Sequence, residues 1–244
     1  MEMQFKRESF LNANVGVEKK YNQLSAVCGL KLEPLINLRD GSIVGYEVLS
    51  VLTDGTSAEK WFALQKPSHL MSLLKLQLAC IKKLSLPDEL KLLFNISIES
   101  LLGMNIKDLN YFSQFKGVSF EISNASNIKR LTNEVRVVLF RRIDELRKLN
   151  FEVWFDDFYI DDLIILNVIM GHIDGVKIDR RELHKPWLKE EIRILRKTLT
   201  NIPVIIEGIE SEEDLSLVSN QDVLFAQGYL WKEKIIKCTR FQHE

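Results

Sequence analysis

The sequence predicts an α/β protein whose strands close into one (β/α)8, TIM-like barrel with an antiparallel first strand pair. Three observations lead to this fold class. Short strand-like runs alternate with longer amphipathic runs over about 220 residues, the length of one such barrel. The later strand runs are almost wholly apolar, as expected for parallel strands covered on both faces. Asp40-Gly41, between the first two runs, is a hairpin signal that makes this pair antiparallel.

The individual elements follow from local patterns. In chain order, the expected strands are Gly29–Leu35, Ile43–Val51, Lys91–Ile96, Gly117–Ile122, Glu152–Phe155, Gly175–Ile178, Val204–Ile206 and Phe225–Leu230. The expected helices are Trp61–Lys83, Asn133–Leu149, Leu188–Leu199 and Glu212–Ser219. In the second helix, apolar residues such as Ile143 and Leu146 recur at three- and four-residue steps, while charged residues such as Arg142 and Glu145 occupy the other side.

We expect a single large domain. No repeat, low-complexity stretch or Pro/Gly/Ser-rich linker interrupts the alternation of strand and helix patterns. Residues 1–27 carry no strong pattern and are interpreted as an N-terminal extension, either a short helix or a partly disordered segment. Residues 28–244 are interpreted as the domain.

Charge and composition argue against several classes of protein. The 33 Lys and Arg residues balance 34 Asp and Glu residues, so the chain lacks the positive field that holds proteins to bulk DNA or anionic lipid. No run reaches the roughly 18–20 apolar residues of a membrane span, and residues 1–27 lack the apolar core of a signal peptide. The three cysteines form no CxxC pair. We therefore expect a cytoplasmic protein that binds neither nucleic acid nor membrane.

Acids, amides and a lysine stand at or near the ends of most expected strands. They are Glu47, Asn95, Glu121, Asp156, Asp157, Lys177, Glu207 and Gln227. The C-terminal strand ends of a barrel meet at one mouth, where such barrels carry their chemistry. Clustered carboxylates repel one another unless cations intervene, and carboxylate and amide oxygens suit Mg²⁺ or Mn²⁺ rather than zinc. Two such ions about 3.5–4 Å apart commonly promote attack of water on a phosphodiester.

Each of these residues taken singly has a structural alternative. An acid at a strand end is more often the N-cap of the following helix than a metal ligand. Lys177 can extend its amine to solvent or pair with Asp179. The paired acids Asp156-Asp157, by contrast, serve no packing purpose after an apolar strand. As a set on successive strands, the polar residues favour phosphate ester chemistry or descent from it.

The order of these motifs resembles the EAL domain family, whose barrels hydrolyse cyclic di-GMP to the linear dinucleotide. The resemblance runs from about Leu32 to Trp231. The motifs, in family order, are Glu33-Pro34-Leu35-Ile36, Val44-Gly45-Tyr46-Glu47-Val48-Leu49, Asn95-Ile96-Ser97, Phe120-Glu121-Ile122-Ser123, Asp156-Asp157-Phe158, Lys177-Ile178-Asp179-Arg180, Glu207-Gly208-Ile209-Glu210 and Gln227-Gly228-Tyr229-Leu230. The signature triplet is thus Glu47-Val48-Leu49, and the resemblance implies an EAL-type barrel.

The resemblance also implies a role for each polar residue. One Mg²⁺ or Mn²⁺ ion would be held by Glu47, Asn95, Glu121 and Asp156, and a second by Asp156 and Asp157. Lys177 and Glu207 would orient and activate the attacking water, with Gln227 assisting. Substrate contacts would come from Leu49, Asp179 and Glu210.

Several departures from the family pattern affect the surroundings of this set. The family's Gly-containing loop after the paired aspartates positions metal and substrate and takes part in dimer contacts; here it reads Phe158–Leu163, without the freedom of glycine to take positive φ. Asn124 replaces a glutamate that anchors this loop. Val51 replaces an arginine that grips a substrate phosphate, and Glu33 replaces a glutamine.

Two main functions follow from this pattern. Because catalysis requires closely held ligands, the departures favour a weakly active or inactive EAL-like protein of cyclic di-GMP, motility and biofilm control. It would resemble the degenerate stand-alone regulators of enteric bacteria and bind a protein partner, with the flagellar master transcription regulator as the best candidate and a homodimer as an open alternative. The second function is an active metal-dependent phosphodiesterase that produces linear pGpG. A sensor that binds cyclic di-GMP without cleaving it is a third.

Overall fold

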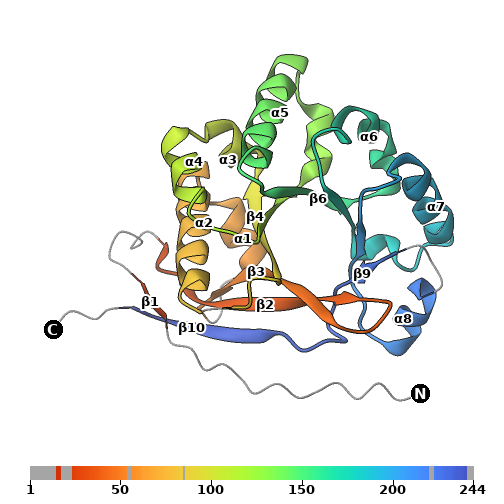
Figure 1. The fold of residues 1–244 in the computed structure, drawn as a ribbon, viewed down its shortest axis with the longest axis horizontal. Helices are drawn as coiled ribbons and strands as arrows, with labels where there is room; N and C mark the ends of the chain where they lie inside the picture. The colour runs from red at the N-terminus through yellow and green to blue at the C-terminus, as the bar shows by residue number, and fades with distance from the viewer. Residues whose placement is uncertain (1–14, 18–23, 54–56, 85, 220–222, 241–244) are drawn as a thin grey trace.

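The computed structural model describes residues 15–17, 24–53, 57–84, 86–219 and 223–240. Eight of its strands form a closed barrel with helices around the outside (Figure 1). They are β2 (Val27–Asn37), β3 (Ile43–Leu52), β4 (Lys91–Ser97), β5 (Val118–Ser123), β6 (Glu152–Phe158), β7 (Gly175–Ile178), β8 (Val204–Ile206) and β9 (Phe225–Ala226). The strands from β3 to β9 run parallel, whereas β2 is antiparallel to β3 and to β9 and closes the ring. The predicted barrel with its antiparallel first pair is confirmed.

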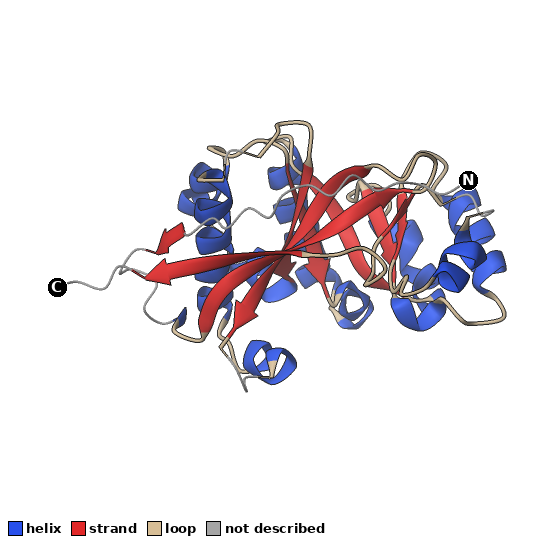
Figure 2. Ribbon diagram, turned by 90° about the horizontal axis from the view of Figure 1, so that it is seen from below, coloured by secondary structure: helices blue, strands red, loops and turns tan. Residues whose placement is uncertain are grey.

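Two further strands extend the sheet beside β2. Strand β10 (Lys234–Arg240) pairs antiparallel with β2, and β1 (Val15–Val17) pairs parallel with β10 (Figures 1 and 2). The sequence pattern predicted neither strand. Within the expected N-terminal extension, Val15–Val17 form a strand rather than a helix, while residues 1–14 and 18–23 lie outside the described residues.

The helices pack on the outer surface of the strands, as Figure 2 shows from the side. They are α1 (Ala58–Ala63), α2 (Pro67–Lys82), α3 (Ile98–Gly103), α4 (Ile106–Phe112), α5 (Asn133–Arg147), α6 (Leu163–Ile169), α7 (Leu188–Thr198) and α8 (Glu212–Val218). Short 3₁₀ helices follow three strands: η2 (Ala125–Arg130), η3 (Ile160–Asp162) and η4 (Arg180–Glu182). Among the described residues, no helix combines the length and apolar character needed to cross a membrane.

Two sequence predictions of element boundaries are wrong for identifiable reasons. The predicted single helix Trp61–Lys83 is two helices, because Pro67 begins α2 and a proline disfavours helical backbone in the residue before it. The predicted strand Phe225–Leu230 ends at Ala226. Gly228 then packs so close to the backbone of Ile209 that a Cβ atom would lie 2.2 Å from its oxygen, and the chain turns there.

A layer of apolar side chains fills the barrel below the mouth. It consists of Leu35, Leu93, Trp154 and Ile205, one from each of β2, β4, β6 and β8. Such layers from alternate strands are the normal filling of (β/α)8 barrels. Gly175 on β7 makes room for the indole, because a Cβ there would lie 2.1 Å from the Trp154 ring. The layer closes the barrel interior below the predicted polar residues.

Candidate active site

Several polar residues of the site lie directly above the apolar layer, because each lies two positions from a residue of that layer on the same strand. Side chains two positions apart on a strand face the same side. Leu93, Trp154 and Ile205 are therefore followed on the inner face by Asn95, Asp156 and Glu207, and on antiparallel β2 Leu35 is matched by Glu33. The intervening strands β3, β5 and β7 contribute Glu47, Glu121 and Lys177. The structure thus brings the predicted residues from successive strands together at one mouth.

Lys177 occupies the centre of this cluster. Its side chain is only 1% exposed, and it forms ion pairs with carboxylates from four strands. The N–O distances are 2.6 Å to Glu207, 3.1 Å to Glu47, 3.1 Å to Glu121 and 3.4 Å to Asp156. Burial alone would lower the pKa of Lys177, but these four carboxylates raise it well above its usual value. Lys177 therefore remains an ammonium ion in the interior of the protein.

Glu47 is the carboxylate with the most hydrogen bonds in the cluster. Its Oε1 accepts from Asn95 Nδ2 at 2.8 Å, and its Oε2 accepts from Gln227 Nε2 at 2.6 Å and from Lys177 Nζ at 3.1 Å. Asn95 is itself oriented by Ser123, whose hydroxyl donates to Asn95 Oδ1 at 2.8 Å. Burial opposes ionisation of Glu47, but Lys177 and the amide donors outweigh it and lower its pKa. Glu47 is thus held as a carboxylate.

Glu121 and Asp156 are held less completely. Glu121 is 0% exposed, and neither of its oxygens nor Oδ1 of Asp156 accepts a hydrogen bond from a described residue. Burial raises the pKa of both groups; Lys177 opposes this rise, and the neighbouring Glu47 carboxylate adds to it. Buried polar atoms normally have partners. These oxygens therefore mark places where another positive group fits.

Asp157 and Glu207 are the remaining carboxylates of the cluster. Asp157, Asp156 and Glu207 place one carboxylate oxygen each within 4.8 Å of one another. Burial, followed by repulsion from Asp156, raises the pKa of Asp157 to about 7, and burial raises that of Glu207 to about 8. These three convergent oxygen donors, together with the Glu121 oxygens that accept no hydrogen bond from a described residue, form a donor set suited to a hard divalent cation such as Mg²⁺ or Mn²⁺.

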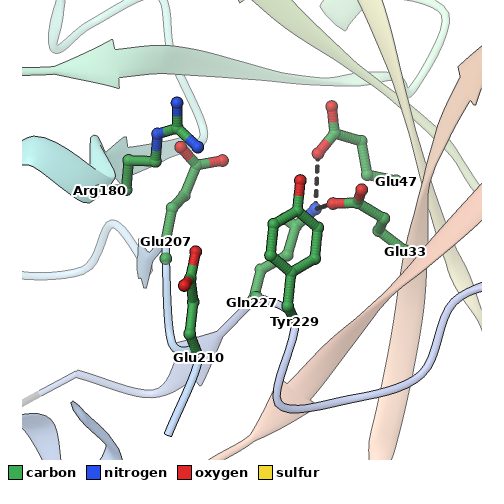
Figure 3. A pocket seen from close by; sticks show the side chains of 9 residues that line it. Glu33, Glu47, Arg180, Glu207, Glu210, Gln227 and Tyr229 are labelled. Atoms are coloured by element: carbon green, nitrogen blue, oxygen red, sulfur yellow. Dashed lines mark hydrogen bonds between the residues drawn. The ribbon is translucent and has the colours of Figure 1, made fainter.

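A pocket opens beside these carboxylates (Figure 3). It is lined by Glu33, Glu47, Arg180, Glu207, Gly208, Glu210, Gln227, Gly228 and Tyr229. Gln227 spans its base, donating from Nε2 to Glu47 and, at 3.1 Å, to Glu33 (Figure 3). Tyr229 is 62% exposed and lies between Glu207 and Glu210 on one side and Glu47 and Glu33 on the other (Figure 3). The pocket leads from solvent to the buried carboxylates.

The three residues expected to bind substrate lie in different places. Glu210 is exposed and lines the pocket. Leu49 is half-buried opposite Lys31 in the sheet and does not line this pocket. Asp179 is buried and also absent from the lining. Its carboxylate caps η4 by accepting from Arg181 N at 2.7 Å, which is the capping role that the sequence left open for strand-end acids.

The altered loop after Asp157 is firmly held in the structure. Asp162, 0% exposed, accepts hydrogen bonds from the Ser126 hydroxyl, from Lys129 Nζ at 3.0 Å and from the Tyr159 backbone N–H at 3.1 Å. No residue from Phe158 to Leu163 has positive φ; the positive value, 52°, belongs to Asp157 itself. Aspartate tolerates this conformation. The loop therefore does not need the glycines that it lacks.

Sequence reasoning missed two kinds of residue at this site. Arg180 and Tyr229 line the pocket, although each stands inside a motif that the sequence singled out. Asp162 is the other, because it is buried in the loop after Asp157 and is held there by Ser126 and Lys129, whereas Asn124 has φ of 54° and makes no capping hydrogen bond. The side chains that Asp162 contacts lie 33 and 36 residues earlier in the chain, so local patterns carry no signal for it.

Comparisons with known proteins place the chain among these barrels. A family model described as EAL domain matches residues 27–234. A comparison with curated proteins finds no match. The fold resembles an EAL domain protein from Listeria monocytogenes EGD-e, with a TM-score of 0.69, 16% identity and coverage of 88% of this chain and 92% of that one. It also resembles the FimX EAL domain from Pseudomonas aeruginosa, a structure bound to c-di-GMP, with a TM-score of 0.67, 20% identity and coverage of 88% and 94%.

A third similar structure contains a metal. The calcium/cy-diGMP complex of Klebsiella pneumoniae BlrP1 aligns with a TM-score of 0.68 and 18% identity. The alignment covers 86% of this chain and 57% of that one, so this chain spans somewhat more than half of BlrP1.

Proposed function

Because this chain belongs to the EAL domain family, we propose that it binds cyclic di-GMP at the mouth of the barrel and hydrolyses it to the linear dinucleotide with a divalent metal ion. The observation that carries the proposal is that both oxygens of buried Glu121 and Oδ1 of Asp156 accept no hydrogen bond from a described residue and have only the Lys177 ammonium as an ion-pair partner. A purely structural cluster would satisfy these oxygens with protein donors. Complexes of FimX and BlrP1 with the same dinucleotide support the choice of ligand.

The anchored loop after Asp157 favours an active enzyme over an inactive protein. The sequence favours an inactive protein because the loop after Asp157 has lost its glycines and its anchoring residue. In the structure, Asp162 supplies another anchor through Ser126, Lys129 and the Tyr159 backbone. Since precise placement of ligands is what catalysis requires, a held loop supports activity.

The residues of the chain divide the work at the mouth. Glu47, Asn95, Glu121 and Asp156 would hold one divalent cation, and Asp156 and Asp157 a second; when bound, such cations would neutralise the carboxylates and polarise a phosphoryl oxygen. Lys177, fixed by four carboxylates, is placed to donate hydrogen bonds to the attacking water or to the phosphate. Its ammonium also balances part of the negative charge that develops during attack.

Glu207 is the best candidate for the proton acceptor. Its carboxylate is oriented by Lys177 at 2.6 Å, faces the pocket and has a pKa raised to about 8 by burial. A base is most effective when its pKa lies near the working pH. In hydrolysis the water oxygen bonds to phosphorus, its proton passes to Glu207, the bond from phosphorus to the 3′-oxygen breaks, and that oxygen takes up a proton.

Product analysis tests the proposal directly. The purified protein, incubated with cyclic di-GMP and Mn²⁺ or Mg²⁺, is expected to release linear pGpG, detected by ion-exchange chromatography. Asp156→Asn should lower turnover at least roughly 100-fold because it removes a donor to the metal site. Asp88→Asn, an exposed residue before β4 at the opposite end of the barrel, should leave turnover unchanged. The absence of both binding and turnover with either metal would contradict the proposal.

A protein that acts by binding a partner is the second candidate, and one surface observation favours it. On α6, the neighbouring helical positions Ile164 and Val168 are 78% and 45% exposed. Exposed apolar residues of this kind are typical of protein interfaces. Capture of the flagellar master transcription regulator by the unmodified protein, with loss of capture in Ile164→Glu/Val168→Glu, would support this function. A homodimer through the same helix would appear as a concentration-dependent mass that the double variant abolishes.

A further inference from the structure

Arg180 is the one cation among the nine residues that line the pocket (Figure 3). Four of the other eight are glutamates: Glu33, Glu47, Glu207 and Glu210. A phosphate that enters this pocket meets a strongly negative surface, so an opposing charge is needed wherever the pocket is to hold one.

The guanidinium of Arg180 is available for such a ligand. The Arg180 side chain is exposed and forms no hydrogen bond or ion pair with another described residue. Three of the glutamates around it already have cationic partners, since Glu47 and Glu207 pair with Lys177 and Glu33 pairs with Lys31. The most basic group of the pocket is therefore unpaired while most of the acids are paired.

The backbone on either side of Arg180 is fixed in place. Asp179 Oδ2 accepts from the Tyr159 hydroxyl at 2.9 Å, and Oδ1 accepts from the Arg181 backbone N–H. The Arg181 guanidinium binds the same carboxylate at 2.9 Å and 3.1 Å and lies over the Tyr159 ring at 4.6 Å. This set of contacts holds the start of η4, so that Arg180 is presented to the pocket rather than left on a mobile turn.

Gly208 makes the same segment fit against the opposite loop. A Cβ atom at Gly208 would lie 2.4 Å from Cβ of Arg180 and 3.1 Å from its Cα. Only glycine allows this approach, and its φ of +81° is a value that other residues rarely adopt. Arg180 is thus seated against the loop that carries Glu207 and Glu210.

We propose that Arg180 binds the phosphodiester of cyclic di-GMP that is not cleaved; this inference rests on the proposed function. The cleaved phosphodiester has to lie over the buried carboxylates and Lys177. Arg180 stands outside that cluster, on the exposed wall of the pocket, where the second phosphodiester of the same ring can meet it. A guanidinium matches two phosphate oxygens with two parallel hydrogen bonds.

Calorimetric titration with cyclic di-GMP in Ca²⁺ tests the contact. Arg180→Met, which keeps much of the side-chain length without the charge, is expected to weaken binding by about tenfold to a hundredfold, the range for a charged hydrogen-bonded pair. The affinity of Arg180→Lys should lie between those of the unmodified protein and Arg180→Met, because an ammonium carries the charge but cannot form two parallel hydrogen bonds to a phosphate. Arg193→Met, an exposed arginine of α7 that pairs with Glu190, is the matched control and should bind as the unmodified protein does.

A neutral analogue distinguishes a phosphate contact from a guanine contact. In cyclic di-GMP with one phosphodiester replaced by a methylphosphonate, the remaining anionic phosphodiester should take the metal site, which leaves the neutral group opposite Arg180. The unmodified protein should then lose affinity by the same factor as Arg180→Met loses with the natural ligand. Arg180→Met should lose nothing further with the analogue, because both changes remove one interaction.

Three results would overturn the inference in distinguishable ways. If Arg180→Met binds cyclic di-GMP as tightly as the unmodified protein, the contact does not exist. If the losses from Arg180→Met and from the methylphosphonate multiply, Arg180 contacts another part of the ligand. If the unmodified protein does not bind cyclic di-GMP at all, the proposed function itself fails and this inference fails with it.

Discussion

Buried and half-buried carboxylates gather in two regions of this protein, and the two regions accommodate them differently. The mouth cluster consists of Glu47, Glu121, Asp156, Asp157 and Glu207 around the Lys177 ammonium. The α7 pair consists of Glu182 and Glu191, which lie outside the mouth and form no ion pair with a described residue. Glu182 accepts from Trp187 Nε1 at 3.1 Å, whereas both oxygens of Glu191 accept no hydrogen bond from a described residue.

The difference shows how each region keeps its charge low enough to be buried. In the mouth cluster a permanent cation balances part of the charge, so the site can exchange protein donors for an incoming cation. In the α7 pair a proton neutralises the charge instead, because burial and then the Glu182 carboxylate raise the pKa of Glu191 to about 8. The two regions therefore differ in whether a cation accompanies the acids, since only the mouth cluster contains a lysine among the described residues.

Replacing the central cation should produce the largest effect. In Lys177→Met, four carboxylates lose their common partner, and breaking buried ion pairs in this way costs about 3–5 kcal/mol. The melting temperature should fall by on the order of 10 °C at pH 8, and by less at pH 5, where the acids take up protons. Turnover of cyclic di-GMP should be lost.

Lys91→Met is the matched control for this change. Lys91 pairs with Glu152 at the start of β4, and both side chains are more than a third exposed. Exposed ion pairs contribute at most about 1 kcal/mol. If the two lysine variants melt within about 2 °C of each other, the buried ammonium is not what holds the mouth cluster together.

Asp162 is a buried carboxylate outside both regions, and it sharpens the comparison because it has three hydrogen-bond donors as partners. Asp162→Asn should lower the free energy of unfolding by about 2–3 kcal/mol, since the amide cannot accept from Ser126, Lys129 and Tyr159 together. Turnover should fall about tenfold as the loop beside Asp157 loosens. Asp161→Asn, an exposed neighbour, should change neither the melting curve nor the turnover; equal effects of the two variants would show that the loop is not anchored by Asp162.

The sequence predicts those parts of the molecule that depend on residues close to one another in the chain. Val204–Ile206 followed by Glu207 is a buried strand that ends in a site residue, and the same pattern recurs before Asp156. Because strands alternate with a period of two and meet at one mouth, the order of motifs alone predicts which residues converge.

What the sequence does not predict depends on contacts between distant segments. Strand β10 contains the run Lys234-Ile235-Ile236-Lys237, which is recognisable only by its pairing with β2. Asp179 caps η4 by accepting from the Arg181 backbone N–H, and it also accepts from Tyr159, which lies in the loop after another strand. Arg180, one residue on, faces the pocket instead.

Glu121→Gln tests separately whether Glu121 contributes to the stability of the fold and whether it contributes to metal binding. Because the pKa of Glu121 is raised well above its usual value, the amide should resemble the protonated acid, and without metal the stability at pH 7 should stay within about 1 kcal/mol. With Mn²⁺ at 100 times its Kd, the unmodified protein should gain about 2.7 kcal/mol, whereas a variant with 100-fold weaker affinity gains only about 0.4 kcal/mol. Melting curves with and without Mn²⁺ measure both numbers; equal metal stabilisation of the two proteins would remove Glu121 from the metal site.

The effect expected in the α7 pair has the opposite sign. Glu191→Gln removes the need to bind a proton on folding, so it should raise the free energy of unfolding at pH 7. The folded state binds the Glu191 proton up to about pH 8, whereas the unfolded chain releases it near the ordinary glutamate pKa of 4.5. The unmodified protein therefore loses stability as pH rises through this window, and the advantage of the variant should be near zero at about pH 4.5 and greatest at about pH 9. Glu190→Gln, on the same helix but exposed and paired with Arg193, should show no such trend in melting temperature. A flat difference between about pH 5 and pH 9 for Glu191→Gln would mean that Glu191 is charged when folded, and the two carboxylate regions would then differ only in their partners.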